Sequence, residues 1–431
     1  MSLFDELLGA PDRDHCPGAH PLLSLSGQED PGFRRALAAA ERRRVSLARR
    51  GTWHGDFVEI DLARTPLARG PAPALEHFAG RWLAARPIVL PGLVADLVRS
   101  ASAELELAGR LFLELSEPGA LRELVAQRIE AAGESFELLS TTRALFDPER
   151  DLERVFLASP PPTPQGRKVQ DLWLKSGWLS TFEDDRSLRL RVSFGRERED
   201  DANGDLLRQR LVARLGRTVL PCAAELDAHA GLRRWIEGLI GEPALLTQAI
   251  GYWNAPEGGA LFHHDAFAED DFATGGIGQL GVCYAQLTGA SFWLALSTQD
   301  LAARVQEFVE LLAEGELAWV RAQLCPTPQA WRGMERLAGD REALERELGL
   351  PGCGRLAALV NRGPEFSALL ADAGHAALLE AGDVILLPNH GPDCTAMHSV
   401  FCAGEEAGYA LSLAIRPDRA AARPDFAPPD R

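Results

Sequence analysis

The chain has 431 residues, of which 46% are hydrophobic and 25% are charged, and this is the balance of a globular protein with a large buried core. A formal net charge of −17 makes nonspecific binding to nucleic-acid phosphates unfavourable. The seven cysteines are scattered without a Cys-x-x-Cys pair, and neither an apolar signal core nor a run of about 18 apolar residues occurs. We therefore expect a cytoplasmic protein with no nucleic-acid or membrane partner.

Residues 1–158 are expected to form a mostly helical N-terminal region. Within it, Pro31–Arg50 has a helical pattern with a cluster of arginines, Phe57–Ala63 has the pattern of a strand, and residues 75–147 are rich in Ala, Leu and Glu. No grouping of side chains in this region indicates chemistry. The proline-rich Ser159–Gln165 predicts a stiff linker to a second domain.

That second domain is expected over residues 166–417, and most of its segments have the alternating pattern of strands. Residues 205–240 and a long insertion at about 298–376 have helical periodicity instead, and residues 418–431 are expected to be a disordered tail. Strands are predicted at Val169–Phe182, Ser187–Phe194, Leu245–Trp253, Gln279–Thr288, Ser291–Ser297, Ala377–Pro388, Met397–Ala403 and Gly408–Ile415.

A candidate metal site begins with His263 and Asp265, which are separated by one residue. Side chains two positions apart in an extended segment point to the same side, so this imidazole and this carboxylate can meet at one ion. His398, which follows the buried strand in GDVILLP, is the best third ligand. Two histidines and one carboxylate on one face of the ion are typical of non-haem Fe(II) oxygenases. This hypothesis requires a barrel of antiparallel strands with the metal at its mouth.

Other histidines near these ligands leave alternatives open. His264 points away from its neighbours in an extended segment and is expected to face substrate or to support the ligands. His390 and Cys394 precede His398 by eight and four residues, which is conceivable for a zinc site, but Pro392 disfavours the helix that a close i, i+4 pair needs.

The last predicted strand carries a candidate anion-binding residue. No lysine follows Lys175, so any fixed cation later in the chain must be arginine. Arg416 shares a face of the strand with small and polar residues, including Ser412, and could pair with a carboxylate through two hydrogen bonds while Ser412 adds a hydroxyl. The alternative is a surface arginine that closes the strand. Arg189 and Arg191, on an earlier strand, are further candidates if Arg416 is not used.

The ordered set of these motifs resembles the cupin-like, double-stranded β-helix oxygenases that depend on Fe(II) and 2-oxoglutarate. HHD at 263–265 is similar to their HxD element, and GDVILLP with HSV, over 382–400, is similar to the element with the distal histidine. YAQLTGASFWLALS at 284–297 resembles a strand pair of the JmjC and asparaginyl-hydroxylase-like branch, where a lysine often binds the cosubstrate. Ser291 stands at that position here. Other branches, such as the phytanoyl-CoA-dioxygenase-like one, use an arginine on the final strand, as Arg416 would be.

The resemblance implies an α+β protein with a double-stranded β-helix (jelly-roll, cupin-like) core, a helical N-terminal region and a helical insertion. It implies that His263, Asp265 and His398 bind Fe(II) and that Arg416, with Ser412, binds 2-oxoglutarate. Together with dioxygen, these cofactors would hydroxylate a small molecule, an amino acid or a peptide. The insertion would then be a lid or a homodimer contact. The alternatives are a metal-dependent cupin enzyme that uses no 2-oxoglutarate and a non-catalytic cupin-fold binding protein.

Overall fold

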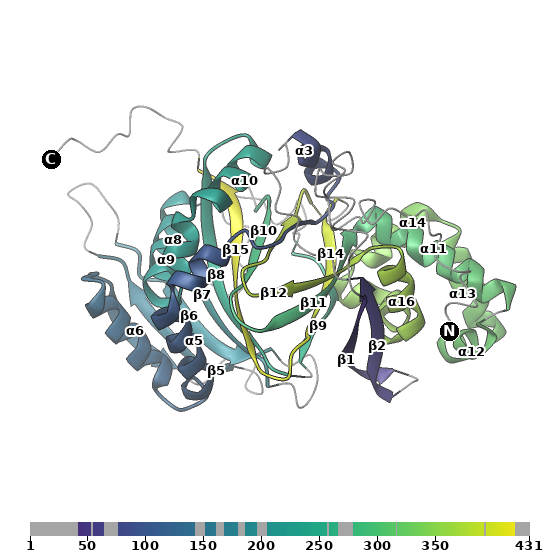
Figure 1. Cartoon of the computed structure of the whole chain (residues 1–431), viewed down its shortest axis with the longest axis horizontal. Coiled ribbons are helices and arrows are strands. Elements are labelled where there is room, and N and C mark those ends of the chain that lie inside the picture. Colours follow the sequence, from purple (N-terminus) through teal and green to yellow (C-terminus); the bar gives the residue numbers. More distant parts are fainter. Residues whose placement is uncertain are drawn as a thin grey trace.

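The computed structural model describes residues 42–52, 55–63, 76–142, 151–160, 168–179, 186–195, 205–256, 258–265, 279–315, 317–391 and 394–418. Its centre consists of two antiparallel sheets, with helices on the outer side of each (Figure 1). In spatial order, the large sheet contains β3 (Ile88–Leu90), β13 (Val384–Pro388), β10 (Gly281–Gln286), β15 (Gly408–Pro417), β8 (Ala244–Asn254), β7 (Leu188–Phe194), β6 (Leu172–Trp178), β5 (Asp151–Ala158) and β4 (Glu137–Thr142). The small sheet contains β12 (Ala376–Glu380), β11 (Ala290–Ser297), β14 (Ala396–Cys402) and β9 (Gly259–His263).

From β8 to β15 the chain passes back and forth between the two sheets. β8, β10, β13 and β15 lie in the large sheet, whereas β9, β11, β12 and β14 lie in the small one. The two sheets share a buried cluster, to which β10 contributes Val282 and Tyr284, while Cys283 between them belongs to the core under the helices. Neighbouring residues of a strand thus face opposite sides of their sheet. The inner faces of the two sheets enclose a space that is lined by side chains from both.

The outer face of the large sheet is covered by the first group of helices, and together they form the largest core. The indole nitrogen of Trp253 in β8 donates to the carbonyl oxygen of Ala108 at 2.7 Å and so fixes the sheet to one helix. The group contains α3 (Glu76–Leu83), α4 (Ala95–Ser100), α5 (Ser102–Glu114), α6 (Ala120–Ala131), α8 (Leu206–Val219), α9 (Ala223–Ala228) and α10 (Ala230–Ile240).

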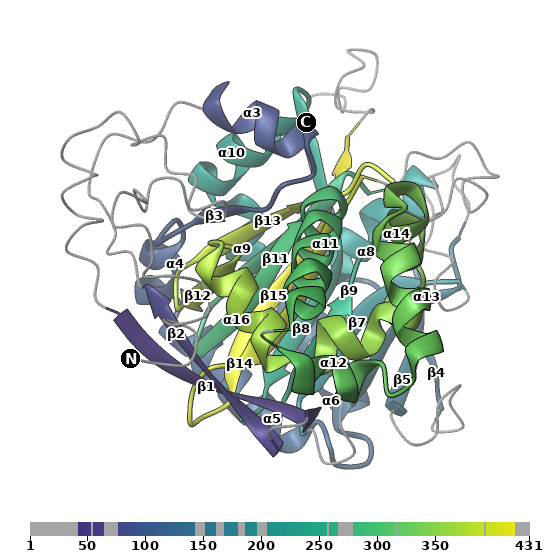
Figure 2. The same ribbon diagram turned by 90° about the vertical axis from the view of Figure 1, so that its right-hand side faces the viewer.

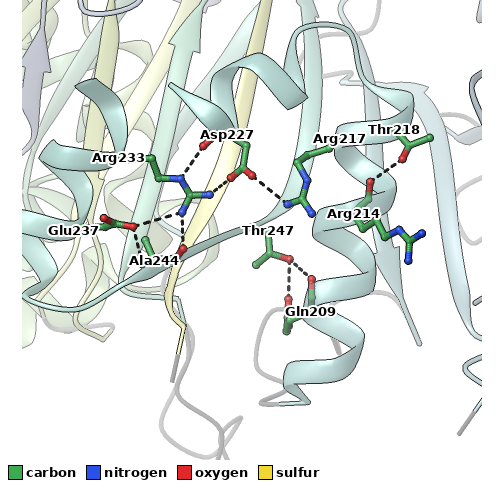
Figure 3. A network of polar contacts seen from close by, with 9 residues as sticks. All are labelled: Gln209, Arg214, Arg217, Thr218, Asp227, Arg233, Glu237, Ala244 and Thr247. Atoms are coloured by element: carbon green, nitrogen blue, oxygen red, sulfur yellow. Dashed lines mark hydrogen bonds and ion pairs between the residues drawn. The ribbon is translucent and has the colours of Figure 1, made fainter. Parts of the chain in front are cut away.

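Polar contacts join three of these helices to β8 (Figure 3). Asp227 in α9 accepts hydrogen bonds from Arg233 in α10 and from Arg217 in α8. Arg233 also donates to the carbonyl oxygen of Ala244, and the Thr247 hydroxyl donates to Gln209 in α8 at 3.0 Å. These contacts hold the first part of β8 firmly against its helices.

A second group of helices covers the outer face of the small sheet (Figure 2). Its longest member is capped by Ser297, whose hydroxyl accepts from the Asp300 N–H at 3.0 Å, and it ends at Gly315 in the left-handed conformation. The group contains α11 (Thr298–Glu314), α12 (Ala318–Leu324), α13 (Pro328–Ala338), α14 (Arg341–Leu348), the 3-10 helix η4 (Pro351–Leu356), α15 (Ala357–Arg362) and α16 (Pro364–Asp372).

The helix predicted at Pro31–Arg50 is wrong over its described part. Residues 42–52 form β1 (Arg42–Thr52), which pairs with β2 (Gly55–Ala63) in an antiparallel hairpin. The alanines and arginines of this segment have high helix propensity, but pairing with the following strand outweighs that local propensity. The strand predicted at Phe57–Ala63 is confirmed by β2.

Two further expectations about the large sheet are corrected. Residues 75–147 contain α3 to α6, but they also contain β3 and β4. β7, which could have been an edge strand facing solvent, lies between β6 and β8. The large sheet also runs across the proline-rich segment, because β5 before it pairs with β6 after it. Most of that segment and residues 419–431 lie outside the described residues.

No helix in the part of the chain that the structure describes is both long and apolar enough to cross a membrane.

Candidate metal centre

The two predicted histidine ligands face each other across one strand pair. His263 ends β9 and is the direct partner of His398 in β14, with ring centroids 4.2 Å apart. Asp265 follows β9, and its Oδ2 lies 3.8 Å from Nε2 of His398. One ligand atom from each of the three residues lies within 4.8 Å of the others, and among the described residues this is the group suited to a metal ion.

Hydrogen bonds to the backbone fix which nitrogen each imidazole offers. Nδ1 of His263 lies 2.6 Å from the carbonyl oxygen of Leu261, and Nδ1 of His398 lies 3.2 Å from that of Ala396. Because a carbonyl oxygen only accepts, Nδ1 carries the proton in both rings and Nε2 keeps its lone pair. Burial and the nearby His263 lower the pKa of His398 to about 4, which keeps its ring in the neutral form that binds metals.

Asp265 is held at one end of the large sheet by two amide side chains. Its backbone carbonyl accepts from Gln279, just before β10, at 3.0 Å and from Asn389, just after β13, at 2.9 Å. The Asp265 side chain remains 40% exposed, whereas that of His398 is 5% exposed. A metal bound here would therefore have one side toward the protein interior and one side open to incoming molecules.

The second group of helices holds the ligand-bearing strand from outside. The backbone N–H of Phe262 donates to the Asn361 side chain at 2.8 Å, and the Cys353 thiol lies 3.7 Å from the Phe262 carbonyl oxygen. His264 points the same way, since its Nε2 lies 3.0 Å from the carbonyl oxygen of Gly349. His264 therefore contacts the insertion and is not a member of the ligand group.

An aromatic wall lies beside the ligands. Trp293 in β11 stacks on His398 with centroids 5.6 Å apart, and Tyr284 meets Trp293 edge to face at 4.7 Å. The Trp293 indole donates to the Ser291 hydroxyl at 2.9 Å, and that hydroxyl donates to Gln286. Ser291, at the position of the branch-specific lysine, thus belongs to a buried polar network. Sequence reasoning missed this wall, although alternation along β11 places Ser291, Trp293 and Ala295 on one face.

Arg416 is buried, with 3% of its surface exposed, so the alternative of a surface arginine is wrong. Leu413 and Ile415 of β15 pack into the core under the helices, which places Arg416 and Ser412 on the face toward the small sheet. An N–H of Arg416 donates to Gln248 at 3.3 Å. The residue before Arg416 pairs with the start of β10, next to Gln279, so Arg416 lies at the same end of the large sheet as the metal group.

The alternative zinc site is not formed. Nε2 of His390 lies 2.7 Å from the carbonyl oxygen of Trp82, and the Cys394 thiol contacts the carbonyl oxygen of Leu83. Both side chains therefore fasten the chain between β13 and β14 to α3. Two imidazoles and a carboxylate remain as possible metal ligands. This mixed nitrogen and oxygen set fits Fe(II) and leaves positions for further ligands.

No family model matches the chain, and no curated protein matches it. Among solved structures, the chain is similar to two structures of YcfD from Escherichia coli, one of which is described as a ribosomal oxygenase. Both are 12% identical to this chain, with TM-scores of 0.24 and 0.25. The similarity covers 80% and 81% of this chain but only 54% and 53% of YcfD.

Proposed function

We propose that the protein is an Fe(II)- and 2-oxoglutarate-dependent oxygenase built on a double-stranded β-helix. The observation that carries this proposal is the convergence of His263, Asp265 and His398 at one end of the space between two antiparallel sheets. The order β13-β10-β15-β8 in one sheet and β12-β11-β14-β9 in the other supports the fold, since the chain alternates between the sheets as a rolled double strand does.

The three side chains would hold Fe(II) through the two Nε2 atoms and the carboxylate. Bound iron and 2-oxoglutarate supply the activation of dioxygen, and the protein supplies their placement. The carbonyl oxygens of Leu261 and Ala396 hold both imidazoles in the tautomer that coordinates. Trp293 stacks on His398 and keeps that ring from rotating, while the buried residues between the sheets exclude water.

Arg416 would hold the far carboxylate of 2-oxoglutarate. Its guanidinium is a fixed cation whose planar fork matches a carboxylate, and its burial makes such a pair stronger than it would be in water. Ser412 lies on the same face of β15 and would add a hydroxyl. The substrate would approach over the exposed side of Asp265, and a small molecule, an amino acid or a peptide would each suit that open side.

A second candidate is a metal-dependent oxygenase that needs no 2-oxoglutarate. One observation favours it: Ser291 replaces the lysine that would bind the cosubstrate and is already bonded to Gln286 and Trp293. This candidate and the main proposal share the metal ligands and differ only in the second cofactor.

Anaerobic titration distinguishes them. Purified protein is mixed with Fe(II) and then with 2-oxoglutarate, and the absorption spectrum is followed for a metal-to-ligand charge-transfer band. We expect a saturable band with 2-oxoglutarate and none with His263→Ala. Iron binding without a band, together with oxygen uptake in the absence of 2-oxoglutarate, would favour the second candidate. A protein that binds no iron would instead be a binding protein without catalysis.

A further inference from the structure

A group of arginines lies where the N-terminal region meets the helical insertion. Arg86, which follows α3, makes two hydrogen bonds to Asp300 in α11, at 2.9 and 3.0 Å. Arg304, one turn further along α11, pairs with Glu307. Arg81 in α3 donates to the carbonyl oxygen of Pro87 at 3.2 Å. The group therefore has one more positive than negative side chain.

Several buried nitrogen atoms in this group have no hydrogen-bond partner among the described residues. They are Nε of Arg81, Nε of Arg304 and Nδ1 of the neighbouring His375. His375 is only 6% exposed. Buried N–H groups are almost always paired in folded proteins, so the unpaired Nε–H groups of Arg81 and Arg304 indicate that an acceptor belongs near them. An oxyanion offers several acceptor oxygens to such donors at once.

The strand register connects this group to the metal centre. The His375 carbonyl oxygen accepts from the N–H of Ala295 in β11, and Ala295 is the direct partner of His398 in β14. Ala377 and Leu379 of β12 face the space between the sheets. His375 precedes them by two and four residues in an extended segment, so its side chain points to the same side. His375 and His398 thus lie two strand spacings apart, about 10 Å, with only the small Ala295 between them.

The charged side chains of this group shift the pKa values of Arg81 and His375. Burial, followed by the neighbouring Arg86, lowers the pKa of Arg81 to about 10. Burial is also the main cause that lowers the pKa of His375 to about 4. The Asp300 carboxylate opposes this shift, and the three arginines add to it. An oxyanion bound among these arginines would offset the repulsion between their positive charges.

We propose that Arg81, Arg304 and His375 form a binding site for an oxyanion, namely a carboxylate or phosphate group. Taking that group as part of the substrate rests on the proposed oxygenase function, whereas the anion site itself does not. A substrate anchored here would extend about 10 Å toward the metal ligands, which suits a small anionic molecule. The three residues lie just before β12, in α3 and in α11, and the site is thus separate from Arg416 on β15.

Calorimetric titration of the full-length protein tests the site, with inorganic phosphate and acetate as separate probes. The buffer contains a chelator to remove metal and enough sodium chloride to keep the ionic strength constant. We expect saturable binding of one phosphate or acetate per chain. Arg81→Gln and Arg304→Gln should each weaken it by roughly tenfold or more, because each removes a charge-assisted hydrogen bond. Tighter binding of acetate indicates a carboxylate ligand, and tighter binding of phosphate indicates a phosphorylated one.

The matched control is Arg99→Gln, which removes an exposed arginine of α4 outside the group and should leave the affinity unchanged. Circular dichroism verifies that each variant is folded, and Arg304→Gln serves if Arg81→Gln is not. The site is refuted if neither anion binds the wild type, or if the folded variants bind as tightly as the wild type. Since no metal is present, failure here says nothing about the oxygenase proposal, which the iron titration tests.

Discussion

His263 and His398 are direct partners in the antiparallel pair of β9 and β14, and each uses Nδ1 to contact a carbonyl oxygen two residues earlier in its own strand. The same backbone geometry therefore orients both rings, although 134 residues separate them (398 minus 263, less one). Both Nε2 atoms are left for an ion that Asp265 also reaches. The site depends on the pairing of these strands as much as on the identity of the ligands.

Replacing His398 by alanine should remove iron binding and with it any iron-dependent formation of succinate. The variant loses one of three ligands, and we expect the affinity for Fe(II) to fall by at least about a hundredfold. Metal analysis after dialysis measures the loss. His264→Ala is the matched control, because His264 contacts Gly349 instead of the ligand group. Equal iron content in wild type and His398→Ala would refute the assignment.

Replacing Arg416 by alanine should raise the concentration of 2-oxoglutarate needed for half-maximal turnover by roughly tenfold to a hundredfold, since a charge-assisted hydrogen bond is lost. Arg416→Lys keeps the charge but loses the fork, so its effect should be smaller. Iron binding should be unchanged in both. An unchanged 2-oxoglutarate requirement would move the cosubstrate site to another cation, and Arg189 and Arg191 would be tested next.

Asn389 and Gln279 are predicted to position Asp265 without touching the metal. Asn389→Ala removes one of two side-chain hydrogen bonds to the Asp265 carbonyl oxygen. We expect about a tenfold loss of Fe(II) affinity, as for other residues that orient metal ligands. Thermal unfolding without metal should change little. Rescue of iron binding by Asn389→Gln, which keeps an amide, would separate positioning from a general structural role.

His375 should make stability depend on pH. Its pKa is lowered to about 4 in the folded protein and lies near 6.5 in the unfolded chain, so between these values the unfolded chain binds more protons. The free energy of unfolding should therefore rise from pH 4 to 6.5, with a contribution of up to about 1.4 kcal/mol per pH unit from this group. Above pH 6.5 its contribution is constant.

Urea unfolding at pH 5, 6 and 7 measures that slope. His375→Asn cannot titrate, so its unfolding free energy should vary less over this interval than that of the wild type. His229→Asn is the control, because the ring of His229 lies near the surface beside the exposed Asp96. Identical slopes in wild type and His375→Asn would show that the His375 ring is not held neutral by burial.

The strands around the site could be predicted because their signal is local. Alternation along β10, β11 and β15, and the apolar run of β13, reflect burial that each strand experiences by itself. The HxD spacing also predicts two metal ligands, His263 and Asp265, without knowledge of the fold. That His398 meets His263 and Asp265 is a hypothesis at the level of the sequence, since nothing local specifies which strands become neighbours.

What escaped prediction depends on distant partners. The sequence around Trp293 predicts a core residue of a strand. Only the register of β11 with β14 places its ring against His398. Nothing in the sequence singles out Gln279 and Asn389. Their role follows only from the fold, in which both side-chain amides donate to the Asp265 carbonyl oxygen. The mixed local propensities of β1 predict a helix, but its pairing with β2 decides its conformation. Local sequence carries none of this information.

The short strand β3 has a consequence for handling the protein. It covers the outer edge of the large sheet by pairing with β13 through Ile88, Val89 and Leu90. A shortened chain that starts after Leu90 would leave the hydrogen-bonding groups along β13 open, and such an edge invites a second molecule to add its own strand. Trimming the N-terminal region would thus turn a self-contained sheet into one prone to aggregation, with the metal ligands themselves untouched.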